Sequence, residues 1–308
     1  MRLPLLSMSL LLLFVDGLGL GARRGNPLSA ADVHALAFYE DSLDGYDYRG
    51  GVLRSADAAM GVDGKPQSAT GQTAIFTGVN TAGLIGRHLS GWPSRKLREL
   101  LREDSIYLRL RRAGIRATFA NAFSPAYFLR PVSRMSATTL HLLYSGLKPR
   151  WIWQIPSGEA VYQDFTNRLL LNSGFDIPEQ TPEVSGAALA AMLDRYDFVL
   201  YEYFLTDAAA HGRIKRSPVE IVSQLERLLV ALLDTADLGK HCVALCSDHG
   251  NIEEESSRTH SKNEVPLAAW GEGAEQLFDG VSSITGIADA VSRHFDISVE
   301  THSEGMHA

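Results

Sequence analysis

The sequence predicts an α/β fold in which helices cover both faces of a mostly parallel β-sheet. Short, almost continuous apolar runs alternate along the chain with longer amphipathic segments. Uninterrupted apolar runs are typical of strands buried on both faces. These runs lie at residues 10–15, 115–120, 198–204, 242–247 and 265–270. Strand–helix alternation favours a parallel sheet, whose ligand sites lie at the carboxyl ends of its strands.

The amphipathic segments between these runs predict helices. They cover residues 92–102, 186–195, 218–236 and 284–294. Pro218 suits the first turn of a helix and Ser217 suits its N-cap. Residues 121–182 differ, because they are rich in proline and aromatic residues and carry only two helical pieces, at 137–144 and 158–171. We expect one domain over residues 1–308, with about 121–182 forming a cap-like insert.

Composition excludes some classes of function. The formal net charge of the 308 residues is -7, which argues against a general nucleic-acid binder, since that needs a basic face. Phosphate chemistry stays open because bound cations reverse the local field. Cys242 and Cys246 lie in one apolar run, roughly 13 Å apart along a strand and too far for a disulfide. The cysteine count suits a reducing compartment.

The apolar N-terminus has two interpretations. Residues 1–15, with one arginine before an apolar run, look like a secretory signal. The nearest candidate cleavage positions come after Asp16, however, so cleavage there would remove Asp16 from the protein. The run is too short for an ordinary transmembrane helix. We therefore expect a buried first strand at 10–15 that ends at Asp16, a cytoplasmic protein and no membrane span.

Acids or histidines lie at the ends of four predicted strands. They follow three of these strands and precede the fourth, at residues 265–270. Each has an ordinary explanation alone, as a turn cap, an exposed loop pair or an isolated histidine. Carboxylate and imidazole groups together suit zinc or manganese. The residues are Asp16, Asp207, His211, Asp248, His249 and His260.

A hydroxyl-rich turn, P-Q-S-A-T-G-Q, leads into a helical stretch. Ser68 and Thr70 lie in this turn, and a hydroxyl at a helix N-terminus suits a nucleophile that meets an anion. The alternative is that Ser68 is simply the helix cap.

Taken together, these motifs resemble the alkaline phosphatase superfamily. The likeness is to the metalloenzyme branch that contains cofactor-independent phosphoglycerate mutase and phosphopentomutase. It rests on D-G at Asp16, S-A-T-G-Q, D-x-x-x-H, D-H-G-N and T-H-S-K-N-E-V-P, in superfamily order. It covers residues 8–80 and 195–295 well and the middle poorly.

The resemblance implies an alkaline-phosphatase-like core and two divalent cations, manganese or zinc. By the same resemblance, one ion would be held by Asp16, Ser68, Asp248 and His249. The other ion would be held by Asp207, His211 and His260. Ser68 would be the nucleophile that forms a phosphoserine intermediate, with Thr70 as the fallback.

Two departures from the mutases favour hydrolysis. Only about 140 residues separate Ser68 from Asp207, whereas the mutases insert a large domain there. Gly71 and Gln72 also stand where the mutase motif has a glycine–histidine pair. We expect a phosphatase-like hydrolase acting on a small phosphorylated substrate; the alternatives are a phosphomutase on a small sugar phosphate or phosphoacid, and a non-catalytic metal-binding scaffold. The oligomeric state is not predicted. Candidate substrate contacts are Arg87, His88, Lys262 and Arg130.

Overall fold

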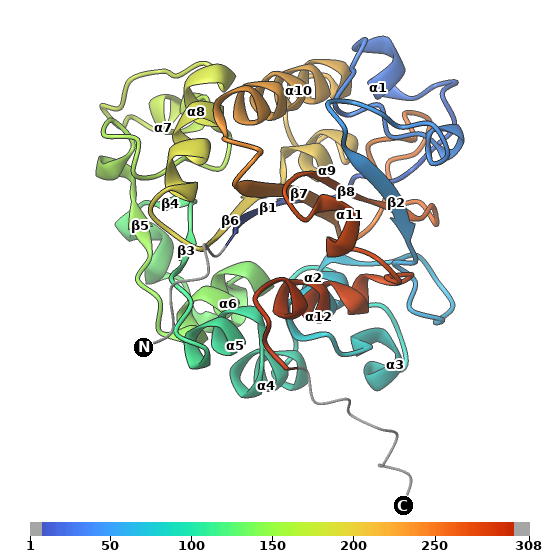
Figure 1. The fold of residues 1–308 in the computed structure, drawn as a ribbon, viewed down its shortest axis with the longest axis horizontal. Coiled ribbons are helices and arrows are strands. Elements are labelled where there is room, and N and C mark those ends of the chain that lie inside the picture. Colours follow the sequence, from blue (N-terminus) through green and yellow to red (C-terminus); the bar gives the residue numbers. More distant parts are fainter. Residues whose placement is uncertain (1–7, 299–308) are drawn as a thin grey trace, which may run out of the picture.

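A six-stranded sheet lies between two layers of helices in the computed structural model, which describes residues 8–298 (Figure 1). The strand order is β2-β8-β7-β1-β6-β3. The strands are β1 (Ser9–Val15), β2 (Val52–Ala56), β3 (Ala117–Phe119), β6 (Phe198–Tyr203), β7 (His241–Ser247) and β8 (Val265–Gly271).

Most of the sheet is parallel, which confirms the predicted fold class. Strands β3, β6, β1 and β7 run parallel, whereas β8 runs antiparallel to both β7 and β2. A parallel crossover usually contains a helix. Residues 248–264, between β7 and β8, contain no helix, and the chain returns antiparallel.

Strand β1 lies at the centre of the sheet and is buried on both faces. Leu10, Leu12 and Phe14 belong to the core on one face, and Leu11 and Leu13 belong to the core on the other. The apolar run at residues 10–15 is therefore the first strand, as predicted. Within residues 8–298, no helix has both the length and the apolar character needed to cross a bilayer.

Helices cover both faces of the sheet. Figure 1 shows α8 and α10 on one side and α2, α6 and α12 on the other. The helices are α1 (Pro27–Ala30), α2 (Ser68–Thr77), α3 (Thr81–Ile85), α4 (Arg95–Glu103), α5 (Ile106–Arg112), α6 (Ala137–Ser145), α7 (Arg168–Asn172), α8 (Pro182–Leu193), α9 (Leu205–Ala210), α10 (Pro218–Thr235), α11 (Ala274–Leu277) and α12 (Ile287–His294).

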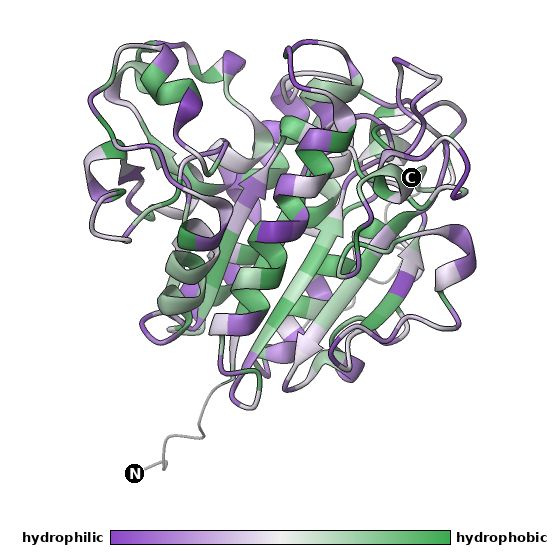
Figure 2. Ribbon diagram, turned by 90° about the horizontal axis from the view of Figure 1, so that it is seen from above, coloured by the Kyte–Doolittle hydropathy of each residue, from purple (hydrophilic) through white to green (hydrophobic). Residues whose placement is uncertain are grey.

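The long helix α10 begins as its sequence predicts. Pro218 is its first residue, and the Ser217 side chain accepts a hydrogen bond from the Glu220 amide at 3.2 Å. Its leucines pack on the sheet. Figure 2 shows that the strands beneath are hydrophobic along most of their length, while the helix in front of them alternates between hydrophilic and hydrophobic residues.

The middle segment divides between the main core and a small separate one. Helix α6 packs against α2 and α4 in the main core. Strands β4 (Ala122–Phe123) and β5 (Arg150–Trp151) form a second sheet at one side of the molecule (Figure 1). A separate apolar cluster joins Ala122, Ile152, Ile155, Ala160 and Leu170. The cap-like role of residues 121–182 stays a prediction.

The predicted helix at residues 158–171 is wrong over most of its length, because the helix there is only α7. The Asp164 carboxylate accepts hydrogen bonds from the amides of Asn167 and Leu169, at 3.0 and 2.9 Å. Phe165 and Asn167 have φ values of 39° and 64°, which a helix cannot accommodate. A side-chain turn therefore replaces the first turns of the predicted helix.

Candidate metal centre and nucleophile

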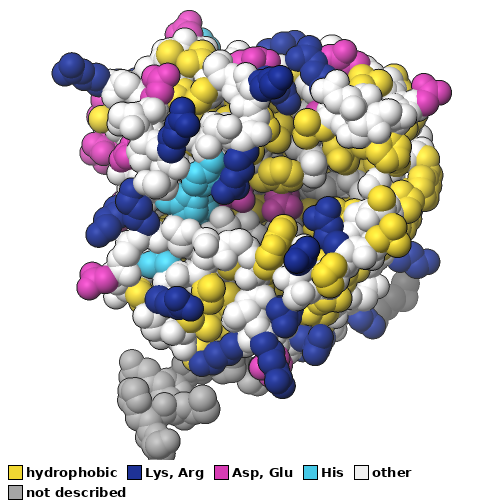
Figure 3. Space-filling view, turned by 180° about the vertical axis from the view of Figure 1, so that it is seen from behind, with side chains coloured by type: hydrophobic (Ala, Val, Ile, Leu, Met, Phe, Trp, Pro, Cys, Tyr) yellow, Lys and Arg dark blue, Asp and Glu magenta, His cyan; other side chains and the backbone are white. Residues whose placement is uncertain are grey.

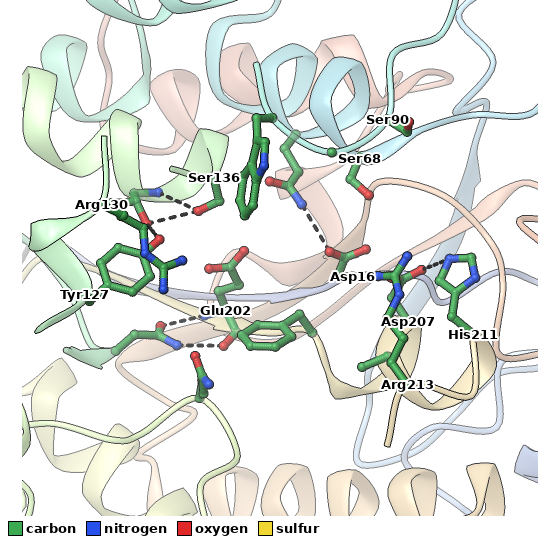
Figure 4. Close-up of a pocket in the computed structure, with 18 of the residues that line it drawn as sticks. Asp16, Ser68, Ser90, Tyr127, Arg130, Ser136, Glu202, Asp207, His211 and Arg213 are labelled. Atoms are coloured by element: carbon green, nitrogen blue, oxygen red, sulfur yellow. Dashed lines mark hydrogen bonds and ion pairs between the residues drawn. The ribbon is translucent and has the colours of Figure 1, made fainter. Parts of the chain in front are cut away.

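The predicted ligands meet at the carboxyl ends of three adjacent strands. Asp16 follows β1, Asp248 and His249 follow β7, and Asp207 lies in α9, directly after β6. Beside them is a cavity of about 870 Å³. Figure 4 shows Asp16, Ser68, Asp207 and His211 around one part of it. We call Asp16, Asp207, His211, Asp248, His249 and His260 the ligand cluster.

Asp207 and two histidines form the first group that could hold an ion. One carboxylate oxygen of Asp207, Oδ1, lies 3.2 Å from His211 Nε2 and 3.4 Å from His260 Nε2. Asn251 Nδ2 donates to the same oxygen at 2.8 Å. One oxygen and two nitrogens from the chain form a donor set typical of zinc and manganese.

Hydrogen bonds fix which ring nitrogens of these histidines are free. His211 Nδ1 lies 2.8 Å from the Arg258 carbonyl oxygen, and His260 Nδ1 lies 2.7 Å from that of Pro66. A carbonyl only accepts, so each Nδ1 carries the proton and each Nε2 of the neutral ring presents a lone pair. The two Nε2 atoms are 3.1 Å apart. Facing lone pairs at this distance fit a shared cation.

A second group shares Asp207 with the first. Ligand atoms of Asp16, Asp207 and His249 all lie within 4.8 Å of one another, and Asp16 Oδ1 is 3.2 Å from His249 Nε2. Within residues 8–298, Asp248 Oδ2 and Asp16 Oδ1 are buried without a hydrogen bond, and Asp16 Oδ1 has only its ion-pair contact with His249. Buried unpartnered carboxylate oxygens are costly, and a cation would satisfy both. The structure thus places Asp207 between the two groups, whereas the resemblance assigned it to only one ion.

The electrostatics of the ligand cluster also fit a cation. Burial, and next the charge of Asp16, raise the pKa of Asp248 well above its usual range. Burial lowers the pKa of His249, but Asp248 and Asp16 outweigh it and raise the pKa to about 10. Burial raises the pKa of Asp207, yet the contact with His260 and the charge of His249 outweigh it, and the net pKa is lowered. The carboxylates therefore favour positive charge at their centre.

Ser68 lies beside the ligand cluster, at the start of a helix. It is the first residue of α2, and its Oγ lies 3.0 Å from His249 Nε2. The N-cap is Gln67, so the alternative that Ser68 only caps the helix is wrong. Thr70 is fully buried, donates from Oγ1 to the Gln67 carbonyl at 3.0 Å and does not line the cavity. The geometry favours Ser68 over Thr70.

The predicted substrate contacts Arg87, His88 and Lys262 do not line the cavity. Arg87 and Lys262 are exposed. The His88 ring turns to the Val62 carbonyl, 3.1 Å from Nε2. Helix α3 ends in a left-handed turn at Gly86, which sequence alone does not orient.

The cationic side chains that line the cavity are Lys65, Arg130 and Arg213, of which only Arg130 was a candidate. All three are exposed. Figure 3 shows histidines at the surface of a hollow with lysine and arginine side chains around it.

Comparison with known proteins gives the family. A profile described as the Metalloenzyme superfamily matches residues 172–295, which include Asp207, His211, Asp248, His249 and His260. The 2,3-bisphosphoglycerate-independent phosphoglycerate mutase of Wolinella succinogenes is 30% identical over 110 residues. That of Pyrococcus horikoshii is 28% identical over 130 residues. These matches support the alkaline phosphatase superfamily for this chain, through a profile that covers residues 172–295 and an alkaline-phosphatase-like fold.

The low sequence identity of the structural match and the short length of the sequence matches limit what these comparisons imply about activity. The alkaline phosphatase of Thermus thermophilus superposes with a TM-score of 0.57 at 11% identity, over 96% of this chain and 93% of the other. That likeness concerns the fold alone. The two mutase matches cover 33% and 39% of this chain, and only 22% and 31% of the relatives. These comparisons therefore do not identify the reaction that this chain catalyses.

Glu253 ties together the loops that carry the superfamily motifs, and the sequence analysis missed it. Its Oε2 accepts hydrogen bonds from the amides of Gly19 and Asn251, at 2.9 and 2.7 Å. Its Oε1 accepts from Ser261 Oγ and from Asn263 Nδ2. A Cβ on Gly19 would lie 2.2 Å from Oε1, so the D-G-x-G turn needs glycine there. A buried, fully hydrogen-bonded carboxylate thus positions three ligand loops.

Glu202 is the second residue that sequence reasoning missed. It interrupts the apolar strand F-V-L-Y-E-Y, and this was the available signal. Thr138 Oγ1 donates to its Oε1 at 2.8 Å. Burial, despite that hydrogen bond, raises its pKa to about 8. Figure 4 shows its carboxylate directed into the cavity near Asp16.

The raised pKa of Glu202 predicts a pH-dependent stability. The folded protein holds this proton between the unfolded pKa of about 4.3 and a folded pKa of about 8. The stabilisation is complete below the lower value and is lost as the pH rises through the upper one. Glu202→Gln cannot ionise. In buffer that contains a metal chelator, the Tm of Glu202→Gln minus the Tm of the native chain should increase by roughly 5 °C between pH 5 and pH 9. A pH-independent difference in thermal melts would contradict this.

Proposed function

We propose that the protein is a metal-dependent phosphoester hydrolase that acts through a phosphoserine intermediate at a two-metal site. The observation that carries this proposal is the position of Ser68 Oγ, 3.0 Å from His249 Nε2. At that position the nucleophile adjoins two possible ligand groups that share Asp207.

The chain supplies both the attacking group and its surroundings. Ser68 Oγ attacks phosphorus, the bond to the alcohol oxygen breaks, and the alcohol leaves with a proton. Water then attacks the phosphoserine, the Oγ–phosphorus bond breaks, and Ser68 recovers its proton. Bound cations would stabilise negative charge on the phosphoryl oxygens and lower the pKa of the hydroxyl. One ion would be held by Asp16, Asp248 and His249. The other ion would be held by Asp207, His211 and His260. Both donor sets allow manganese or zinc.

Hydrolysis is favoured over mutase activity by the middle segment. A mutase retains its phosphorylated intermediate and excludes water, which a large covering domain assists. Here α6 packs into the main core, so part of the roughly 140 intervening residues belongs to the core and does not cover the cavity. Phosphomutase activity is the second candidate, because the relatives quoted above are mutases.

Metal removal tests the proposal. With manganese or zinc, the purified protein should release phosphate from p-nitrophenyl phosphate. Chelation should lower this rate at least about 100-fold, because the ions contribute several kcal/mol to transition-state stabilisation. Refilling should restore the rate, and Arg87→Ala, outside the cavity, should behave like the native chain. Chelator-insensitive turnover would refute the metal role, and isomerised sugar phosphate without phosphate release would favour the mutase.

A further inference from the structure

The cavity extends well beyond the ligand cluster and Ser68. Its other walls carry an unusual share of aromatic side chains, which phosphoryl transfer does not require. They are Trp92, Phe119, Phe123, Tyr127, Tyr162 and Phe204. Aromatic faces of this kind pack against apolar faces of rings. This end of the cavity therefore suits the alcohol part of a phosphate ester.

Glu202 lies between the two ends. Its strand pairs with β1 in a register that aligns Glu202 with Phe14, and Asp16 follows two residues later on the same face. Strand spacing and rise put the Cα atoms of Glu202 and Asp16 about 8 Å apart. In Figure 4 the Glu202 carboxylate lies between Asp16 on one side and Tyr127 and Arg130 on the other. A group bound to Glu202 would be a few bonds from a phosphoryl group beside Ser68.

The Glu202 carboxylate is held rigidly and keeps one oxygen available. Asn121 hydrogen-bonds both the amide and the carbonyl of Glu202, at 2.8 and 2.7 Å. Thr138 occupies Oε1, whereas Oε2 has no hydrogen-bond partner within residues 8–298. The side chain is buried. Oε2 is not among the buried atoms that lack a partner; Glu202 lines the cavity, so a bound ligand can take the place of water at this oxygen.

The carboxyl group of Glu202 determines which kinds of ligand group can form a hydrogen bond with it. A hydroxyl both donates and accepts, so it pairs with Glu202 in either protonation state. A carboxylate pairs only with the acid form, and an ammonium group only with the ionised form. The lysine and arginine side chains that line the cavity within residues 8–298, Lys65, Arg130 and Arg213, are all exposed, so none of them is buried beside Glu202 to pair with a carboxylated substrate.

We propose that Glu202 selects phosphate monoesters of neutral, hydroxyl-bearing rings, as in sugar and nucleoside phosphates, by hydrogen bonding a ring hydroxyl while the ring lies against the aromatic side chains. The inference rests on the proposed hydrolase function and adds its substrate class. Carboxylated esters such as phosphoglycerate are poor substrates in this arrangement.

Three esters and two variants test the selection. Each value of kcat/KM is divided by that for p-nitrophenyl phosphate, which has no hydroxyl, so that losses of folding cancel. Ribose 5-phosphate and adenosine 5′-monophosphate should each exceed 3-phosphoglycerate at least about tenfold. Glu202→Leu should lower the ribose 5-phosphate ratio about tenfold, and Glu202→Gln, which still hydrogen-bonds a hydroxyl, should restore it to within about threefold. A larger value for the nucleotide would assign the aromatic end to the base, and a larger value for ribose 5-phosphate would assign the pocket to the sugar alone.

Two outcomes would overturn the proposal: an unchanged ratio in Glu202→Leu, or a preference for phosphoglycerate in the native chain. Absence of p-nitrophenyl phosphate turnover would instead refute the hydrolase function. Selection is then measured by binding, as the rise in Tm of manganese-loaded Ser68→Ala on adding ribose 5-phosphate. Glu202→Leu in that background should abolish the rise, and a persistent rise would also count against Glu202.

Discussion

Replacing Ser68 by alanine should lower phosphate release at least about 1,000-fold, because removing a nucleophile leaves only the stabilisation supplied by the rest of the site. Metal content should stay close to that of the native chain. Asp207, His211 and His260 stay in place in this variant and can hold one ion without Ser68. The measurements are steady-state turnover with saturating manganese and the metal-to-protein ratio after dialysis.

Two further observations separate a nucleophile from a structural serine. Acid quenching during turnover should trap one phosphoryl group on the peptide that contains Ser68, and none in Ser68→Ala. Thr70→Val is the matched hydroxyl variant. It loses a buried hydrogen bond to the Gln67 carbonyl, so about 1 kcal/mol of stability, but should retain turnover within about tenfold. If Thr70→Val were inactive and Ser68→Ala active, the assignment would be reversed.

The strands that sequence predicted well are those whose environment is uniform. β1, β6 and β7 are buried on both faces, so their apolar runs are continuous. β2 was missed, because this edge strand, V-L-R-S-A, has only two buried residues, Leu53 and Ala56, and contains Arg54. Periodicity also gave no direction for β8, since the strand direction depends on a loop rather than on the strand itself.

The site was predictable where chemistry coincides with strand ends. A carboxylate or histidine directly after a buried strand lies at one edge of a parallel sheet, so Asp16 and Asp248 could be placed near each other from order alone. Arg87 and Lys262 could not be excluded, because loop direction decides whether a basic side chain meets the cavity. Glu202 and Glu253 depend on contacts more than 40 residues away, with Thr138 and Gly19, which no local pattern shows.

Asp207→Asn should affect both ions, because the Asp207 carboxylate belongs to both possible ligand groups. The amide can keep the hydrogen bond from Asn251 at nearly the same geometry, so the fold should persist. The shared negative charge is lost. We expect affinity for manganese to fall at least about 100-fold, more than for a residue outside the coordination shell, and turnover at fixed metal to fall about 1,000-fold.

Metal titration distinguishes this effect from a defect in folding. Turnover of Asp207→Asn should recover partly as manganese is raised, while its far-ultraviolet circular dichroism matches that of the native chain. Asp194→Asn is the matched control, since the Asp194 side chain is 79% exposed and its one ion pair within residues 8–298 is with His241, at 3.3 Å. It should retain metal content and turnover. Full metal content in Asp207→Asn would show that Asp207 is not a ligand that both ions share.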